Sequence, residues 1–95
     1  MVGVLRIGPA VRYTFSDESL AYLQTVMVSH LLNHNPFTLH VQHGHVESPT
    51  TIAITEKTPI LFFFDSEQPP QLDSATVRWM SEEIDLTGSL HFTAH

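Results

Sequence analysis

The residues best suited to chemistry in this chain are its histidines, of which there are seven in 95 residues. Two pairs have spacings that could present ring nitrogens to one metal ion. His30 and His34 stand four residues apart on an expected helix, and His43 and His45 point to the same side of an expected strand. A zinc site would need a third and a fourth ligand in addition to one such pair. The sequence has neither an H-E-x-x-H motif nor a cysteine. These four histidines are the metal-ligand candidates, and the alternative is that they are satisfied within the fold or face a partner.

Other catalytic chemistry has less support in the sequence. Glu82, Glu83 and Asp85 cluster near the end of an expected helix, where a solvated face is the simpler interpretation. The chain has no G-x-S-x-G elbow, no glycine-rich phosphate loop and no H-x-E…C-x-x-C deaminase pattern. The sequence therefore predicts no catalytic residue and no cofactor. It favours a binding domain over an enzyme and leaves the enzyme open.

Composition excludes several classes of protein. Four basic residues against ten acidic ones give a net charge of −6, so the chain lacks the cationic surface that nucleic-acid binders need. It contains no apolar run long enough to span a membrane, and its first residues lack the basic-then-apolar order of a signal peptide. The absence of cysteine excludes disulfides and thiolate chemistry. We expect a cytoplasmic protein.

Hydrophobic periodicity and turn residues predict a single α+β domain over residues 1–95. Ser16 is the expected N-cap of a first helix that stops near Asn33, and Asp73 is the expected N-cap of a second helix that runs to about Ile84. The predicted order is β-β-α-β-β-β-α-β. Short connections favour one mainly antiparallel sheet, including a meander of three consecutive strands, with both helices packed on one face. The expected strands are 2–7, 11–15, 37–45, 51–55, 60–64 and 90–94.

A long uncharged segment is the most informative feature of the sequence. Between Ser19 and Val46 the chain has no Asp, Glu, Lys or Arg, although this segment holds a whole helix and a whole strand. Because helix surfaces that face water usually carry charges, and because strand 60–64 is apolar on both faces, we predict a homodimer or another protein partner. The alternative is an efficient monomer core. The predicted interface residues are Tyr22, Val26, Leu32, Leu61, Phe63 and Trp79.

The histidines add a pH hypothesis to this interface. They are almost the only titratable side chains of the uncharged segment, and acidification would load positive charge onto it. An interface built there should weaken as the pH falls through about 6. The sequence thus favours a non-catalytic, self-associating interaction domain, with a small-molecule-binding or metal-binding domain that uses the clustered histidines as the alternative.

Three blocks carry a resemblance to a known family. The run Phe15-Ser16-Asp17-Glu18-Ser19-Leu20-Ala21-Tyr22-Leu23-Gln24, the turn Pro69-Pro70-Gln71-Leu72 and the closing Gly88-Ser89-Leu90 resemble a family of small actinobacterial proteins of unknown function. Some of its members carry the name ATP-dependent DNA ligase. Adenylyl transfer requires a nucleophilic lysine in a K-x-D-G motif, whereas the only lysine here stands in Glu56-Lys57-Thr58-Pro59. The resemblance therefore implies a fold layout and no functional residues.

Overall fold

Two helices and six strands follow one another in the predicted order β-β-α-β-β-β-α-β in the computed structural model, which describes residues 2–43, 50–68 and 70–94. The fold class α+β is therefore confirmed. The elements are β1 (Val2–Ile7), β2 (Val11–Ser16), α1 (Asp17–Leu32), β3 (Phe37–His43), β4 (Thr50–Ile54), β5 (Ile60–Phe63), α2 (Ser74–Thr87) and β6 (Ser89–Ala94).

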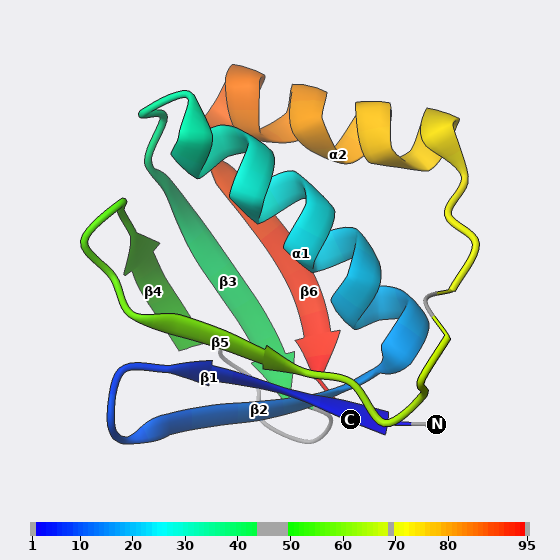
Figure 1. The fold of residues 1–95 in the computed structure, drawn as a ribbon. Coiled ribbons are helices and arrows are strands. Elements are labelled where there is room, and N and C mark those ends of the chain that lie inside the picture. The colour runs from blue at the N-terminus through cyan, green and yellow to red at the C-terminus, as the bar shows by residue number, and fades with distance from the viewer. Residues whose placement is uncertain (1, 44–49, 69, 95) are drawn as a thin grey trace.

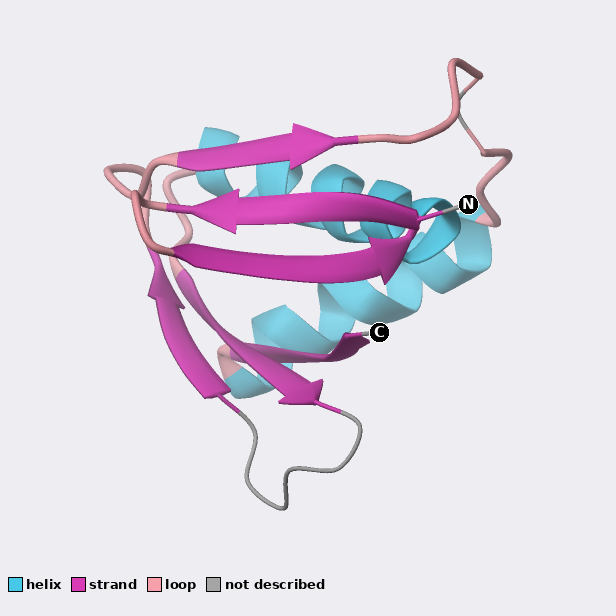
Figure 2. Cartoon of the chain, turned by 90° about the horizontal axis from the view of Figure 1, so that it is seen from below, coloured by secondary structure: helices cyan, strands magenta, loops and turns pink. Residues whose placement is uncertain are grey.

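The strands of the described residues form two three-stranded sheets, so the prediction of a single sheet is wrong. One sheet has the order β2-β1-β5 and the other the order β4-β3-β6 (Figure 2). Three of the four strand pairings are antiparallel, and β3 pairs with β6 in parallel. The parallel pair exists because α2 returns the chain across the molecule before β6 begins, as a crossover connection does.

The prediction of a three-stranded meander is wrong for its last strand. Strand β5 pairs with β1 and not with β4, its neighbour in sequence. After β4, a turn closed by the bond from Thr58 N to Thr55 O (3.1 Å) redirects the chain. The amide of Gly8, in the β1–β2 turn, then donates to the Pro59 carbonyl at 2.8 Å. Strand β5 pairs with β1, and its inward side chains, Ile60 and Phe62, are half-buried against the core.

Helix α1 begins and ends as the sequence predicts. Ser16 accepts a hydrogen bond from the Ser19 amide at 3.1 Å, and Asn33 is the C-cap. Helix α2 begins after Asp73 as expected, but it continues past Ile84 to Thr87 and ends at Gly88 in the left-handed conformation. Both helices lie on the same side of the two sheets (Figure 1). Helix α1 packs on β1 and β2 and against α2, and α2 also packs on β6. Among the described helices, none is long and apolar enough to cross a membrane.

One hydrophobic core joins the two sheets and the two helices. Phe15 of β2 meets Phe92 of β6 edge to face, with ring centroids 6.0 Å apart, and so connects the sheets. Helix α1 supplies the largest share of any single element. Its side chains in the core are Leu20, Leu23, Val26 and Met27, and strands β1–β4 and β6 and helix α2 close around them.

The buried carboxylate of Asp17 connects the start of α1 to the end of β5. Its oxygens accept hydrogen bonds from the backbone amides of Asp65 (3.1 Å) and Ser66 (2.8 Å). Because two N–H donors face the carboxylate at a helix N-terminus, its burial is compensated. Gly3 lies beside this junction, where a Cβ atom would stand 2.6 Å from the Phe63 carbonyl oxygen and 2.9 Å from Asp17 Oδ1.

We expect the substitution Gly3→Ala to lower the free energy of unfolding by about 1–3 kcal/mol, because the new methyl group would meet backbone that cannot turn aside. Urea denaturation followed by circular dichroism measures this loss. Thr14→Ala, on the outward face of the neighbouring strand, is the control and should change stability by less than about 0.5 kcal/mol. A Gly3→Ala protein as stable as the parent would contradict the close approach of β1, β5 and α1.

Candidate functional site

The outer face of the β2-β1-β5 sheet, which points away from the helices, is apolar and basic. On β1, Val2, Val4 and Arg6 alternate with buried side chains and point outward. Strand β5 adds Leu61 and Phe63, which are 52% and 51% exposed. The register places Val4 beside Phe63 and Arg6 beside Leu61. These residues together with Arg12 are called the sheet patch below.

The two arginines of the sheet patch are neighbours of like charge. Arg6 on β1 pairs directly with Arg12 on β2, and both side chains are exposed. Like charges opposite each other on a sheet are destabilising. No ion pair among the described residues involves either arginine. Arg6 also lines a shallow hollow of about 290 Å³ with Gly8, Pro9, Pro59 and Leu61.

A second exposed surface, on α2, is apolar and acidic. Trp79 and Leu86 are 64% and 85% exposed, on the side of the helix opposite the buried Met80 and Ile84. Their spacing of seven residues puts them on one stripe, with two carboxylates between them. The stripe consists of Trp79, Glu82, Glu83 and Leu86 and is called the helix stripe below. Trp79, one of the predicted interface residues, is therefore on the outer side of its helix.

The remaining predicted interface residues lie on α1, at three different depths. Val26 is buried in the core at 1% exposure, so its side chain is not part of the surface of this chain. Tyr22 is half-buried, and its hydroxyl accepts a hydrogen bond from the Asp73 amide at 2.8 Å. Leu32 is 75% exposed at the end of the helix. The structure does not bring these α1 residues together with the sheet patch.

The histidine pair predicted on α1 does not converge on one point. His30 is buried inside the helix, whereas His34 lies beyond the helix end with φ of 55° and is exposed. His34 Nδ1 contacts Glu56 Oε2 at 2.7 Å. The other predicted pair lies outside what can be described, namely the side chain of His43 and all of His45. Over the described residues, no group of three or more His, Cys, Asp or Glu could hold a metal ion.

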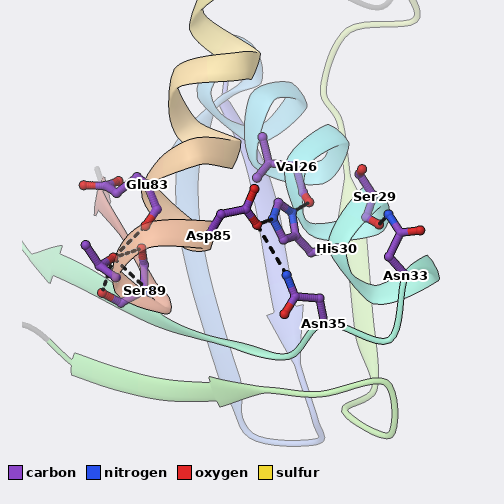
Figure 3. A network of polar contacts seen from close by, with 9 residues as sticks. Val26, Ser29, His30, Asn33, Asn35, Glu83, Asp85 and Ser89 are labelled. Atoms are coloured by element: carbon purple, nitrogen blue, oxygen red, sulfur yellow. Dashed lines mark hydrogen bonds and ion pairs between the residues drawn. The ribbon is translucent and has the colours of Figure 1, made fainter.

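His30 is a structural residue at the meeting point of α1, α2 and β3. Its Nδ1 donates to the Val26 carbonyl oxygen at 2.9 Å, and its Nε2 lies 3.2 Å from Asp85 Oδ1 (Figure 3). Asn35 Nδ2 approaches the same carboxylate oxygen at 3.5 Å, and Phe37 packs edge-on to the imidazole. Because both partners of the ring are acceptors, both bonds form together only when the ring carries two protons.

Sequence reasoning missed a third histidine arrangement, His40 with His91. They are paired in the parallel register of β3 and β6, and their rings are stacked with centroids 4.5 Å apart and planes 16° apart. His40 Nδ1 also lies 2.9 Å from Thr51 Oγ1 on β4. The only signal in the sequence was that both histidines stand on the polar side of an alternating strand. Their contact depends on a parallel pairing between residues 51 positions apart.

We expect His30→Ala to lower the free energy of unfolding by about 1–3 kcal/mol, since it removes a buried ring and two hydrogen bonds. Asp85→Ala should cost less than about 1 kcal/mol, because the carboxylate is largely exposed. In the double variant the second substitution should add nothing, as urea denaturation can measure. Additive losses would contradict the His30–Asp85 contact. A nitrogen-15 NMR spectrum in which Nδ1 of His30 carries no proton would contradict the bond to the Val26 carbonyl.

Comparison with known proteins gives a family without an activity. Neither the curated proteins nor the solved structures contain a match to this chain. One family model does match, and it covers residues 2–95, which include every described element. With almost the whole sequence covered by that model, the chain belongs to the family described as Domain of unknown function (DUF7882).

Proposed function

We propose that this domain is a non-catalytic interaction module whose partner is a second copy of the same chain. The observation that carries the proposal is the sheet patch, where four apolar side chains stand beside two unpaired arginines on one flat face. Contiguous exposed apolar surface of this kind is uncommon on monomeric proteins unless it binds something. The patch joins Val2, Val4, Leu61 and Phe63 to Arg6 and Arg12.

Charge decides what the sheet patch binds. A two-fold dimer with patch against patch would bring four guanidinium groups together and remove them from water. Burial of an unpaired charge costs several kcal/mol, so a symmetric contact of this kind is unfavourable. The occupant must instead offer carboxylates next to apolar side chains.

The helix stripe of another copy meets this requirement. Glu82 and Glu83 supply two carboxylates for Arg6 and Arg12, and each guanidinium can accept a carboxylate in bidentate geometry. Trp79 supplies a flat aromatic surface over which an arginine can stack, which adds about 0.5–2 kcal/mol when water is excluded. The hollow beside Arg6, lined by Pro9, Pro59 and Leu61, has the apolar walls that such a side chain needs.

The placement of the two surfaces fixes the kind of assembly. Helix α2 lies at one end of the molecule and the β2-β1-β5 sheet at the other, as both views show (Figures 1 and 2). A contact between unlike surfaces at opposite ends is heterologous, so each added copy leaves one free surface at either end. We therefore propose head-to-tail chains or a ring in place of the two-fold dimer expected from the sequence. The patch comprises six side chains, whereas a standard interface has about 20–30 residues a side, so we expect the association to be weak.

A DNA ligase activity, which the name carried by some members of the resembling family implies, is not part of this proposal. Lys57 is exposed in the tight turn between β4 and β5, where Thr55 and Thr58 bond to each other's backbone. No K-x-D-G motif surrounds it, so the nucleophile that adenylyl transfer requires has no counterpart in this sequence.

We expect the molar mass from light scattering to rise above the 10.7 kDa of one chain as the protein concentration increases. Phe63→Glu should abolish this rise, because it puts a carboxylate into the apolar centre of the sheet patch. Leu32→Glu is the matched control, since Leu32 is a more exposed apolar residue on α1, outside both surfaces. A Leu32→Glu protein that alone becomes monomeric would contradict the proposal, as would a wild type that is monomeric up to about 1 mM.

The pairing of unlike surfaces has its own test. Arg6→Glu and Glu82→Arg should each weaken association by about tenfold, the effect of losing one close charge pair. The combined variant should recover most of the loss, because the exchanged charges attract again. If Phe63→Glu abolishes association while the combined variant shows no recovery, the sheet patch stands as an interface and the helix stripe is not its partner.

A further inference from the structure

The sheet patch holds two arginines in an arrangement that costs stability. Arg6 and Arg12 are directly opposite each other in the register of β1 and β2, and the Cβ atoms of such a pair stand about 4.5–5.5 Å apart. Like charges at this separation repel each other. Because the chain has only four Lys and Arg residues, half of its cations are placed side by side. The repulsion becomes an attraction when a ligand with two negative charges lies between the guanidinium groups.

The surroundings of the two arginines leave them without a neutralising group. Among the described strands of this sheet, the other outward side chains are apolar or carry a hydroxyl, and none is Asp or Glu. The ion pairs of the described residues involve neither arginine. The positive charge of the pair is therefore available to a ligand from solvent.

A hollow with apolar walls adjoins Arg6. It measures about 290 Å³, and Gly8, Pro9, Pro59 and Leu61 line it together with Arg6. The β1–β2 turn and the start of β5 lie at the same end of the sheet (Figure 2), and the bond of 2.8 Å from the Gly8 amide to the Pro59 carbonyl connects them. Because proline has a fixed φ angle, two of the walls are rigid. The hollow can hold a flat apolar group next to a bound anion.

We propose that Arg6, Arg12 and this hollow form a binding site for a small aromatic phosphate monoester. A phosphate monoester has three terminal oxygens and a charge of about −1.5 to −2 at pH 7. One such group can accept two hydrogen bonds from each guanidinium. A monocarboxylate has two oxygens and one charge, so it matches a single arginine. The aromatic group of the ester lies against the proline walls.

This site rests in part on the proposed function, because the same arginines take part in both. In the proposed assembly, Glu82 and Glu83 of another copy bring two negative charges to the sheet patch, and Trp79 brings an aromatic ring. An aromatic phosphate monoester offers both features in one molecule. The ligand and the second copy therefore exclude each other, and the ligand regulates the assembly. Binding of the ligand to a single chain does not depend on the assembly.

The experiment is an NMR titration of the full chain with phenyl phosphate, followed on the backbone amides of β1 and β2 and on the arginine Nε–H signals. The ionic strength is held constant, because salt screens exposed charges. The signals of Arg6 and Arg12 should shift saturably, with a Kd of about 1 mM. Inorganic phosphate lacks the ring, and benzenesulfonate has the ring but a single charge. Each should bind about tenfold more weakly than phenyl phosphate.

Substitutions test the two arginines separately. Arg6→Gln and Arg12→Gln should each weaken the binding of phenyl phosphate by about tenfold, the effect of losing one close charge pair. Arg78→Gln, which removes an exposed arginine of α2, is the matched control and should bind as the wild type does. Without ligand, both patch variants should melt at or above the wild-type temperature, because each removes one of two like charges. A lower melting temperature would contradict the repulsion between the arginines.

Three results would overturn the phosphate site. The first is the absence of saturable shifts at Arg6 and Arg12 up to about 20 mM phenyl phosphate. The second is unchanged affinity in both arginine variants, and the third is equal binding of phenyl phosphate and benzenesulfonate. A phosphotyrosine peptide that binds more tightly than phenyl phosphate would assign the phosphate to another protein and so overturn the small-molecule ligand.

Light scattering separates the failure of this site from the failure of the proposed self-association. Phenyl phosphate should lower the molar mass of concentrated wild-type protein, and benzenesulfonate at the same ionic strength should lower it less. Glu82→Arg leaves the sheet patch intact and should still bind phenyl phosphate. If it does so while the wild type stays at 10.7 kDa, the phosphate site stands and the self-association is wrong. If the wild type associates and phenyl phosphate shifts neither arginine, the phosphate site is wrong.

Discussion

Helix α1 is covered on three sides, and most of the structure depends on that cover. The strands close one side, α2 closes another, and the segment after β5 closes the helix start through the bonds from Asp65 and Ser66 to Asp17. A charged side chain on the covered side of this helix would have to leave water without a partner, at a cost of several kcal/mol. The acidic residues of α1 lie in its first turn.

This position accounts for much of the uncharged segment within a single chain. The prediction of a partner was based on the absence of charged residues between Ser19 and Val46. Such an absence indicates that the segment is buried, but it does not distinguish burial within the chain from burial against a partner. The structure assigns the cover to elements of the same chain, since Val26 faces the core and β3 is the central strand of its sheet. Leu32 and Val28 are the exposed apolar residues that remain on α1.

What could be predicted from the sequence was local. The cap at Ser16, the strands β1 and β2 and the start of α2 after Asp73 depend on neighbours a few residues away, and all of them are found. Two of the four strand pairings were not predictable, because β5 joins β1 and β6 joins β3 across more than forty residues, and short strands carry no mark of their distant partner. The sheet patch and the histidine stack share this limit. The sheet patch exists because Leu61 and Phe63 stand next to β1, and the histidine stack exists because His91 stands next to β3.

The division into two sheets separates two surfaces of opposite chemistry. A single continuous sheet would have put the arginines and the histidines on one face. Half of the four basic side chains, Arg6 and Arg12, are instead gathered on one sheet, and the other sheet faces outward without charge. The net charge of −6 is therefore distributed unevenly, with two of the four cations on the sheet patch and carboxylates on α2. In the proposed head-to-tail assembly, the basic patch of one copy would attract the carboxylates of another before contact, since complementary potentials orient an encounter. In a patch-to-patch dimer, the arginines of the two copies would repel each other. The positions of the few cations, and not the amount of apolar surface, therefore set the orientation of the proposed assembly.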